Sequence, residues 1–199
     1  STYWFLGSEI ALFLMMFSAY FYLLFTGRMT MPAEMPNVTL AIINTTFLLG
    51  SSVTVHIAHH DLLHEKRKTF IGLLAATIVL GLCFLGFTAL EWQELLATGD
   101  PTENLYLAAF FSITGLHGLH VIIGLTMLLV ALVRRALGHF TPKLNNGMEV
   151  PTAYWHLVDG VWIFVLLFVY IVPTFYQGPN QVFEAVDPFS VYEREMPAE

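Results

Sequence analysis

The sequence predicts an all-α fold, a polytopic membrane protein built as a bundle of five transmembrane helices. Hydrophobic residues make up 56% of the chain and charged residues only 12%, whereas charged residues make up about 25% of a typical soluble domain. The few charges gather in short clusters and near the C-terminus, which leaves five long apolar segments. None of these segments shows the polar stripe that a helix of a soluble core turns towards water. The formal charge of −7 also argues against nucleic acid as a partner.

The five segments have the length that a membrane span requires. Crossing about 30 Å of hydrocarbon at about 1.5 Å per residue takes about 20 apolar residues. We expect helices over residues 4–25, 38–59, 70–90, 105–133 and 153–175. Prolines mark the loops between them, at Pro32 and Pro36, at Pro101, and at Pro142 and Pro151. The fourth helix exceeds a perpendicular span, so it should tilt or extend beyond the bilayer.

Lysine and arginine counts predict the orientation. Two of the four loops are basic, one with Lys66, Arg67 and Lys68, the other with Arg134, Arg135 and Lys143. The positive-inside rule places both loops in the cytoplasm. The N-terminus is then cytoplasmic and the C-terminus external. We divide the chain into a transmembrane domain, residues 1–176, and an acidic external tail, residues 177–199. Because the sequence begins at Ser1 without a methionine, we expect a short stretch to precede it.

Glu9 lies inside the first apolar segment, where a lone charge costs at least a few kcal/mol. We expect it to be protonated or paired. One interpretation is a carboxylate that handles protons or gates a path. The other is a neutral acid that hydrogen-bonds a neighbouring helix. The residues themselves favour neither.

His117 and His120 share one face of the fourth helix, three residues apart. Imidazoles at this spacing could bind zinc, copper or haem iron. However, Gly115, Gly118 and Gly124 allow close helix approach, where histidines commonly hydrogen-bond across the contact. We therefore favour a structural role, with no metal bound.

His156 and Asp159 are likewise three residues apart, on the fifth helix, and could pair or bond the fourth helix. Trp155 beside them suits an interface or a lipid contact. Glu91 closes the third helix, which we expect to place it near the outer surface.

Histidines also gather where the second helix ends, at His56, His59, His60 and His64. A metal site is conceivable there, but binding of anionic lipid headgroups or plain solvation is favoured. We name His59, His60, Arg67 and Trp155 as candidates for headgroup contact.

Five motifs carry a family resemblance. They are SE at residues 8–9, NTTFLL at 44–49 with AHH at 58–60, ALEW at 89–92, FFSITGLHGLHVIIG at 110–124 and YWHLVDGVW at 154–162. Together, and in the same order, they resemble subunit III of cytochrome c oxidase, from residue 4 to about residue 173. The mitochondrial type has seven helices, so this chain resembles the five-helix form of bacteria.

The resemblance implies a non-redox subunit of an aerobic terminal oxidase in the bacterial cytoplasmic membrane. The chain would carry no haem, copper or catalytic site, because those belong to subunits I and II. It would pack mainly against subunit I, hold phospholipid in a cleft, and support proton uptake or oxygen access. Glu9 would be the family's intramembrane carboxylate. The interhelical polar anchors would be His117, His120, His156, Asp159, Asn44 and Glu91.

The sequence departs from the family at two places. Gly160 replaces a bulkier residue, and the tail beyond Pro173 is longer than usual. We expect the tail to contact a periplasmic cytochrome or another respiratory complex.

Other functions stay open. Subunit III of a quinol oxidase and the accessory protein of nitric oxide reductases are close kin, although quinol types tend to carry aspartate where this chain has Glu9. A stand-alone transporter or proton channel would use Glu9 and Asp159. A di-haem cytochrome would use the histidines of the fourth and fifth helices.

Overall fold

The computed structural model describes residues 2–29, 31–32, 35–63, 67–137 and 146–175. The tail of residues 177–199, His64, Lys66, Lys143 and the side chain of Arg67 lie outside this description. The described helices are α1 (Thr2–Phe25), α2 (Val38–Leu63), α3 (Arg67–Thr98), α4 (Leu105–Ala136) and α5 (Asn146–Val165), which continues through the π-helix η1 (Leu166–Ile171) into α6 (Val172–Phe175).

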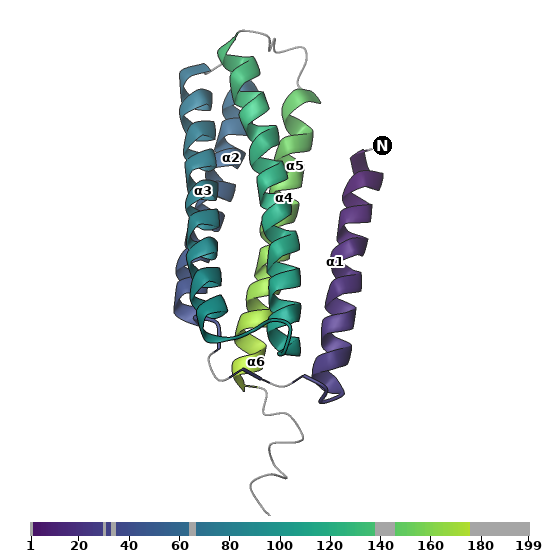
Figure 1. Ribbon diagram of the computed structural model, residues 1–199. Coiled ribbons are helices and arrows are strands. Elements are labelled where there is room, and N and C mark those ends of the chain that lie inside the picture. Colours follow the sequence, from purple (N-terminus) through teal and green to yellow (C-terminus); the bar gives the residue numbers. More distant parts are fainter. Residues whose placement is uncertain (1, 30, 33–34, 64–66, 138–145, 176–199) are drawn as a thin grey trace, which may run out of the picture.

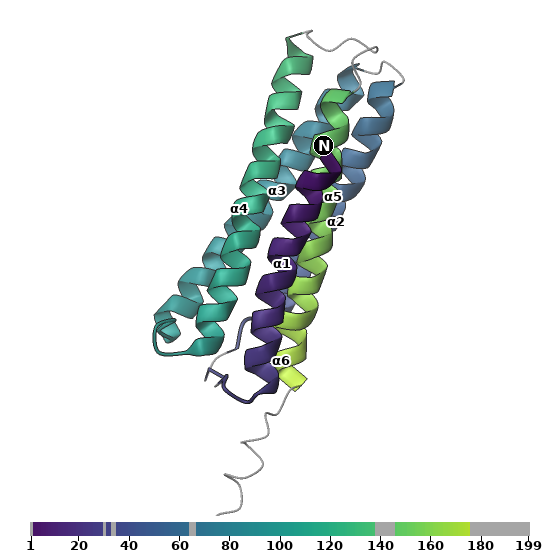
Figure 2. The same ribbon diagram turned by 90° about the vertical axis from the view of Figure 1, so that its right-hand side faces the viewer.

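Five helices within these residues are long and apolar enough to cross a membrane. The chain is therefore an all-helical, multi-pass membrane protein. The helices run up and down, with α2 packed most extensively against α3, and α4 beside α5 (Figure 1). α1 stands to one side, as both views show (Figure 2), and packs against α4, α5 and the π-helix η1.

The helix ends fall into two groups. α1 begins towards the end of the bundle where α2 and α4 finish and α5 starts, whereas α6 finishes at the opposite end (Figure 1). The described helix ends that flank the two basic loops thus lie on one side of the bundle. Which side faces the cytoplasm stays a prediction from the positive-inside rule.

Several helices run further than the apolar pattern suggests. α3 continues to Thr98, eight residues beyond the expected end. α5 starts at Asn146, so that Pro151 lies inside it rather than in the loop. Because Pro151 is only in the second turn, its missing N–H removes a single backbone hydrogen bond near the start of the helix. Hydropathy identifies only the part of a helix that lies in hydrocarbon. A helix can continue beyond its apolar run, so the expected bounds were too narrow.

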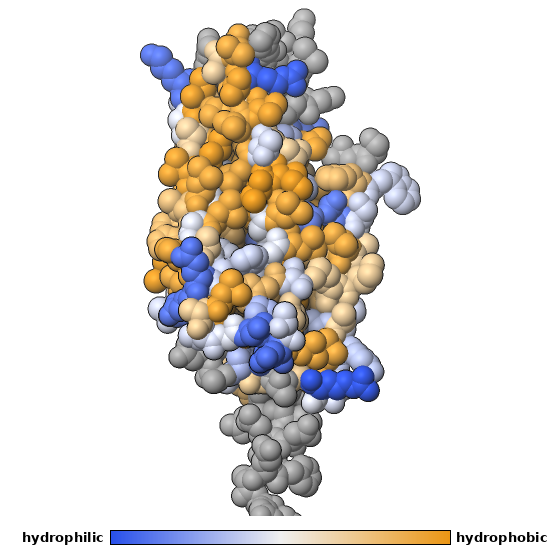
Figure 3. All heavy atoms as spheres, in the orientation of Figure 1, coloured by the Kyte–Doolittle hydropathy of each residue, from blue (hydrophilic) through white to orange (hydrophobic). Residues whose placement is uncertain are grey.

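Apolar side chains cover most of the middle of the molecule, and hydrophilic ones gather mainly towards its two ends (Figure 3). Large exposed side chains include Leu14, Met15 and Phe164. The interior instead holds polar residues, among them Asn44 and Asp159. This arrangement suits a lipid solvent, in which buried polar groups must find partners on other helices.

Candidate functional site

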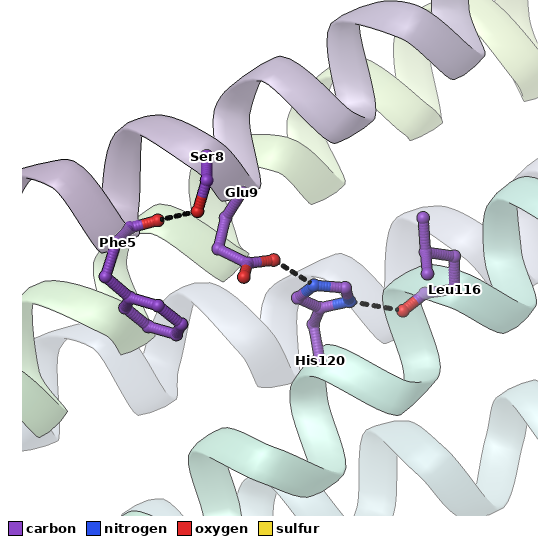
Figure 4. A network of polar contacts seen from close by, with 5 residues as sticks. All are labelled: Phe5, Ser8, Glu9, Leu116 and His120. Atoms are coloured by element: carbon purple, nitrogen blue, oxygen red, sulfur yellow. Dashed lines mark hydrogen bonds and ion pairs between the residues drawn. The ribbon is translucent and has the colours of Figure 1, made fainter.

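Glu9 on α1 and His120 on α4 make a polar contact between these two helices (Figure 4). Glu9 Oε2 lies 2.6 Å from His120 Nε2, and His120 Nδ1 lies 2.7 Å from the carbonyl oxygen of Leu116. A carbonyl oxygen only accepts, so Nδ1 carries a hydrogen. The short contact at Nε2 then needs one further proton, held either by the imidazole or by the carboxyl group. The pair as a whole is neutral in both cases, which lowers the cost of burying it.

Ser52 on α2 joins two residues of α5. Its hydroxyl contacts Asp159 Oδ2 and lies 3.0 Å from His156 Nδ1. Asp159 is buried, at 4% exposure. Its second oxygen, Oδ1, has no hydrogen-bond partner among the described residues.

Two tryptophans of α5 bond hydroxyl groups of α2. Trp155 Nε1 donates to Ser51 Oγ at 3.0 Å, and Trp162 Nε1 donates to Thr45 Oγ1 at 2.9 Å. Both indole rings are buried. Trp155 is therefore inside the bundle and away from the surface, so it drops out of the predicted headgroup contacts.

Asn44 and Glu91 connect α3 to its neighbours. Asn44 Nδ2 donates to Thr88 Oγ1 at 3.0 Å. Glu91 Oε2 accepts from the hydroxyl of Tyr170 in η1 at 2.7 Å. Glu91 is buried, at 3% exposure, and not near the outer surface as expected, because α3 continues for two more turns.

His117 is the exception among the six predicted anchors. Its side chain is buried, yet neither ring nitrogen has a hydrogen-bond partner among the described residues. The ring packs instead against Phe84 and Trp162, with centroids 5.8 and 5.0 Å away. His120, His156, Asp159, Asn44 and Glu91 each hydrogen-bond a residue of another helix.

Two tyrosines that sequence reasoning missed bind the backbone of η1. Tyr20 on α1 donates to the carbonyl of Phe168 at 3.0 Å, and Tyr106 on α4 donates to the carbonyl of Val169 at 2.7 Å. Pro173, which follows on the same helix, was the only available signal, because a proline leaves backbone carbonyls without a donor.

Two of the histidines near the end of α2 lie close to residues of α5, and a third is exposed at the surface. His59 Nδ1 lies 3.4 Å from Thr152 Oγ1, and the ring of His56 lies 6.2 Å from that of His156. His60 is exposed. No group of three or more histidine, cysteine or acidic residues suited to a metal ion occurs in the described part of the chain.

The sequence profile of the family described as cytochrome c oxidase subunit III matches residues 2–174. The chain belongs to this family. The subunit 3 of Danio rerio is 45% identical over 146 residues, covering 73% of this chain and 53% of the relative. That of Branchiostoma lanceolatum is 39% identical over 174 residues, covering 83% and 66%. That of Marchantia polymorpha is 36% identical over 174 residues, covering 83% and 65%.

The chain thus spans between about half and two thirds of the length of these curated cytochrome c oxidase subunit III relatives. Family membership and the five apolar helices agree on a multi-pass membrane protein. The match to this family confirms the resemblance of the five motifs.

Proposed function

We propose that the chain is a non-redox subunit III of a cytochrome c oxidase, which reduces oxygen and pumps protons across a bacterial cytoplasmic membrane. The family match over residues 2–174 carries this proposal. The curated relatives named above are all cytochrome c oxidase subunits. Their names favour cytochrome c over quinol as the electron donor of the complex. The chain would stabilise subunit I and contact subunit II, and haem and copper would be held by those partners.

A scaffold role fits the physical character of the bundle. Its polar side chains bond one another across α1–α4, α2–α5, α2–α3 and α3–η1. Large apolar side chains are exposed on all five spanning helices, and the middle of the face in Figure 3 is mostly apolar, so this surface is available to lipid or to another membrane subunit. Polar groups used in this way set the positions of helices and are not available to coordinate a redox centre.

Affinity purification from native membranes tests the proposal. The tagged chain should bring down two larger subunits, identified by mass spectrometry, together with a haem spectrum. The same tag on an unrelated multi-pass protein is the control. A colourless chain that purifies alone would refute an oxidase subunit, and a haem spectrum from the separated chain itself would show a cytochrome instead. Transport by the isolated chain in liposomes would indicate a channel or transporter.

A groove of about 350 Å³ between α1 and α5 supports lipid binding by the chain. Its lining is almost wholly apolar and comes from Ile10, Phe13, Leu14 and Phe17 on one side and His156, Leu157, Gly160, Val161 and Phe164 on the other. We propose that an acyl chain of a phospholipid occupies it. His59 and His60 are the described headgroup candidates at the end of α2.

Gly160 offers a sharp test of the lipid site. A Cβ atom added there meets no atom within 4 Å, and Gly160 lines the groove, so Gly160→Leu should fill the groove without disturbing the packing. We expect less phospholipid to be retained by the purified complex. Gly86→Leu, at a position with equally open space on α3, is the control. Equal lipid content in both variants would contradict the site.

Glu9 is proposed to support proton uptake, because its partly buried carboxyl group lies 2.6 Å from His120 Nε2, a distance over which a proton can pass between them. Glu9→Gln, which cannot release a proton, should slow proton uptake by the complex while leaving assembly intact. An unchanged rate would leave Glu9 with a structural role alone.

The tail of residues 177–199 is proposed to contact a periplasmic cytochrome or another complex. Removing it should reduce recovery of that partner without loss of oxidase subunits. Full recovery would argue against the contact.

A further inference from the structure

A row of groups that can both accept and release protons connects the end of α2 to the buried carboxyl group of Asp159. Three histidines of α2 stand at the outer end of this row, namely half-buried His59 and the exposed His56 and His60. The ring of His56 lies 6.2 Å from that of His156 on α5. His156 Nδ1 lies 3.0 Å from Ser52 Oγ, and the same hydroxyl contacts Asp159 Oδ2. Four of these side chains lead from two exposed imidazoles to the buried carboxyl group, namely His56, His156, Ser52 and Asp159.

His56, at the outer end of the row, lies within the apolar span Val38–Asp61. It lies seven residues before the end of α2 at Leu63, about 10 Å along the helix axis. His59 is on the same helix face, one turn closer to that end. His60 beyond it is 62% exposed.

The inner end of the row is closed. Asp159 is 4% exposed, and its Oδ1 has no hydrogen-bond partner among the described residues. Among the described residues, Asp159 is therefore hydrogen-bonded only at Oδ2, by Ser52.

A serine hydroxyl has a single hydrogen, so Ser52 can donate to only one of its two neighbours. In one state Ser52 donates to ionised Asp159, and His156 donates its Nδ1 hydrogen to Ser52. In the other state protonated Asp159 donates to Ser52, and Ser52 donates to the bare Nδ1 of His156. The two states differ by the shift of one proton along each bond of the row.

We propose that His156 and Ser52 relay protons between the surface at His56 and the carboxyl group of Asp159, which stores them inside the bundle. A proton arriving at Nε2 of His156 makes an imidazolium ion. Its Nδ1 proton then passes to Ser52 Oγ as the hydroxyl proton passes to Asp159 Oδ2. One proton enters, one carboxylate is neutralised, and His156 returns to a neutral state as its other tautomer.

The relay is distinct from the pair of Glu9 and His120, which joins α1 to α4. It also does not depend on which complex holds the chain. Co-purification tests the proposed function, whereas the exchange kinetics of one carboxyl group test the relay, so that either can fail without the other.

Infrared spectroscopy of the purified complex measures the stored proton directly. The carbonyl stretch of protonated Asp159 should appear in the wild type, vanish in Asp159→Asn, and shift when the complex is transferred to D₂O. In Ser52→Ala we expect this shift to occur about a hundredfold more slowly, since one proton-transferring group is lost. Ser52→Thr, which keeps a hydroxyl group, should restore the rate.

Ser51→Ala is the matched control. Its hydroxyl is the neighbour of Ser52 on α2 and also reaches α5, but it bonds Trp155 and not the carboxyl group. It should exchange at the wild-type rate. The proposal is overturned if no band distinguishes wild type from Asp159→Asn, if Ser52→Ala exchanges as fast as wild type, or if Ser51→Ala is equally slow. Should Asp159→Asn fail to assemble, the frequency of the band in Ser52→Ala decides, because losing the hydroxyl must shift it.

Discussion

The hydroxyl of Tyr106 donates a 2.7 Å hydrogen bond to the carbonyl of Val169, four residues before Pro173. In an α-helix the N–H of residue 173 would donate to that carbonyl, and a proline has none. Tyr20 bonds the carbonyl of Phe168 in the same way, the acceptor that a π-helical turn would assign to residue 173. The preceding residue does follow the π pattern, since the N–H of Val172 bonds Leu167. Side chains of α1 and α4 thus complete the backbone bonding of the last helix.

Removing one of these hydroxyls should destabilise the bundle. Tyr106→Phe leaves a buried carbonyl without a donor, which costs about 1–3 kcal/mol. Tyr22→Phe, on the exposed side of α1, is the control and should be close to neutral. The midpoint of denaturant unfolding in detergent micelles measures both. Equal effects would mean that the hydroxyl of Tyr106 does not matter.

The role of Pro173 makes a second prediction about the same bond. Pro173→Ala restores a backbone N–H that can donate to Val169, so the hydroxyl of Tyr106 becomes partly redundant. Tyr106→Phe should therefore cost less in the Pro173→Ala background than in the wild type. A double-mutant cycle measures the coupling. Strictly additive free energies would contradict the compensation.

The bundle should lose more stability when one residue of the Glu9–His120 pair is replaced by an apolar residue than when both are. Glu9→Gln keeps a donor for the bare Nε2 of His120 and should be mild. Glu9→Leu leaves that nitrogen buried and unbonded, at a cost of about 1–3 kcal/mol. Adding His120→Phe to Glu9→Leu removes the orphaned group and should recover part of the loss. Unfolding midpoints of the three variants decide, and a double variant no more stable than Glu9→Leu would refute the pairing.

Gly124 tests how tightly α4 packs on α5. A Cβ atom there would lie 2.9 Å from Trp155 Cε3, and that indole is buried and cannot move aside. Gly124→Ala should destabilise the chain by about 1–3 kcal/mol through overpacking. Gly86→Ala, in open space on α3, should be neutral or slightly stabilising because alanine favours helix. Matching unfolding midpoints for the two variants would show that this contact is loose.

The sequence was sufficient to predict the five spans, because hydropathy and length along the chain depend on local composition. It also identified Glu9 and His120 as residues that need partners. It could not show that they partner each other, since they are 111 residues apart and their meeting depends on how α1 and α4 are rotated. Glu91 was misplaced because the end of a helix was taken from the end of its apolar run, whereas α3 continues to Thr98.

The π-helix lay beyond sequence reasoning for a similar reason. Pro173 is visible in the sequence, but the bonds that compensate for it come from Tyr20 and Tyr106, on two other helices. His117 was misassigned as a hydrogen-bonding anchor, since its spacing from His120 gives both residues one face while only His120 meets an acid.

The loop between α3 and α4 should depend on pH through Asp100. Its Oδ1 accepts from the backbone N–H of Thr102 at 2.8 Å and from the hydroxyl of Thr102 at 2.7 Å. Because these bonds favour the charged form, they hold the pKa of Asp100 below its usual value. The stabilisation is therefore complete above the pKa of the unfolded chain and is lost as the pH falls through the lower, folded-state value. Hydrogen exchange at the Thr102 amide, corrected for its intrinsic pH dependence, should show protection that disappears in acid. Asp100→Asn keeps an acceptor that does not titrate, so its protection should not change with pH, whereas acid-sensitive protection in that variant would assign the effect to another group.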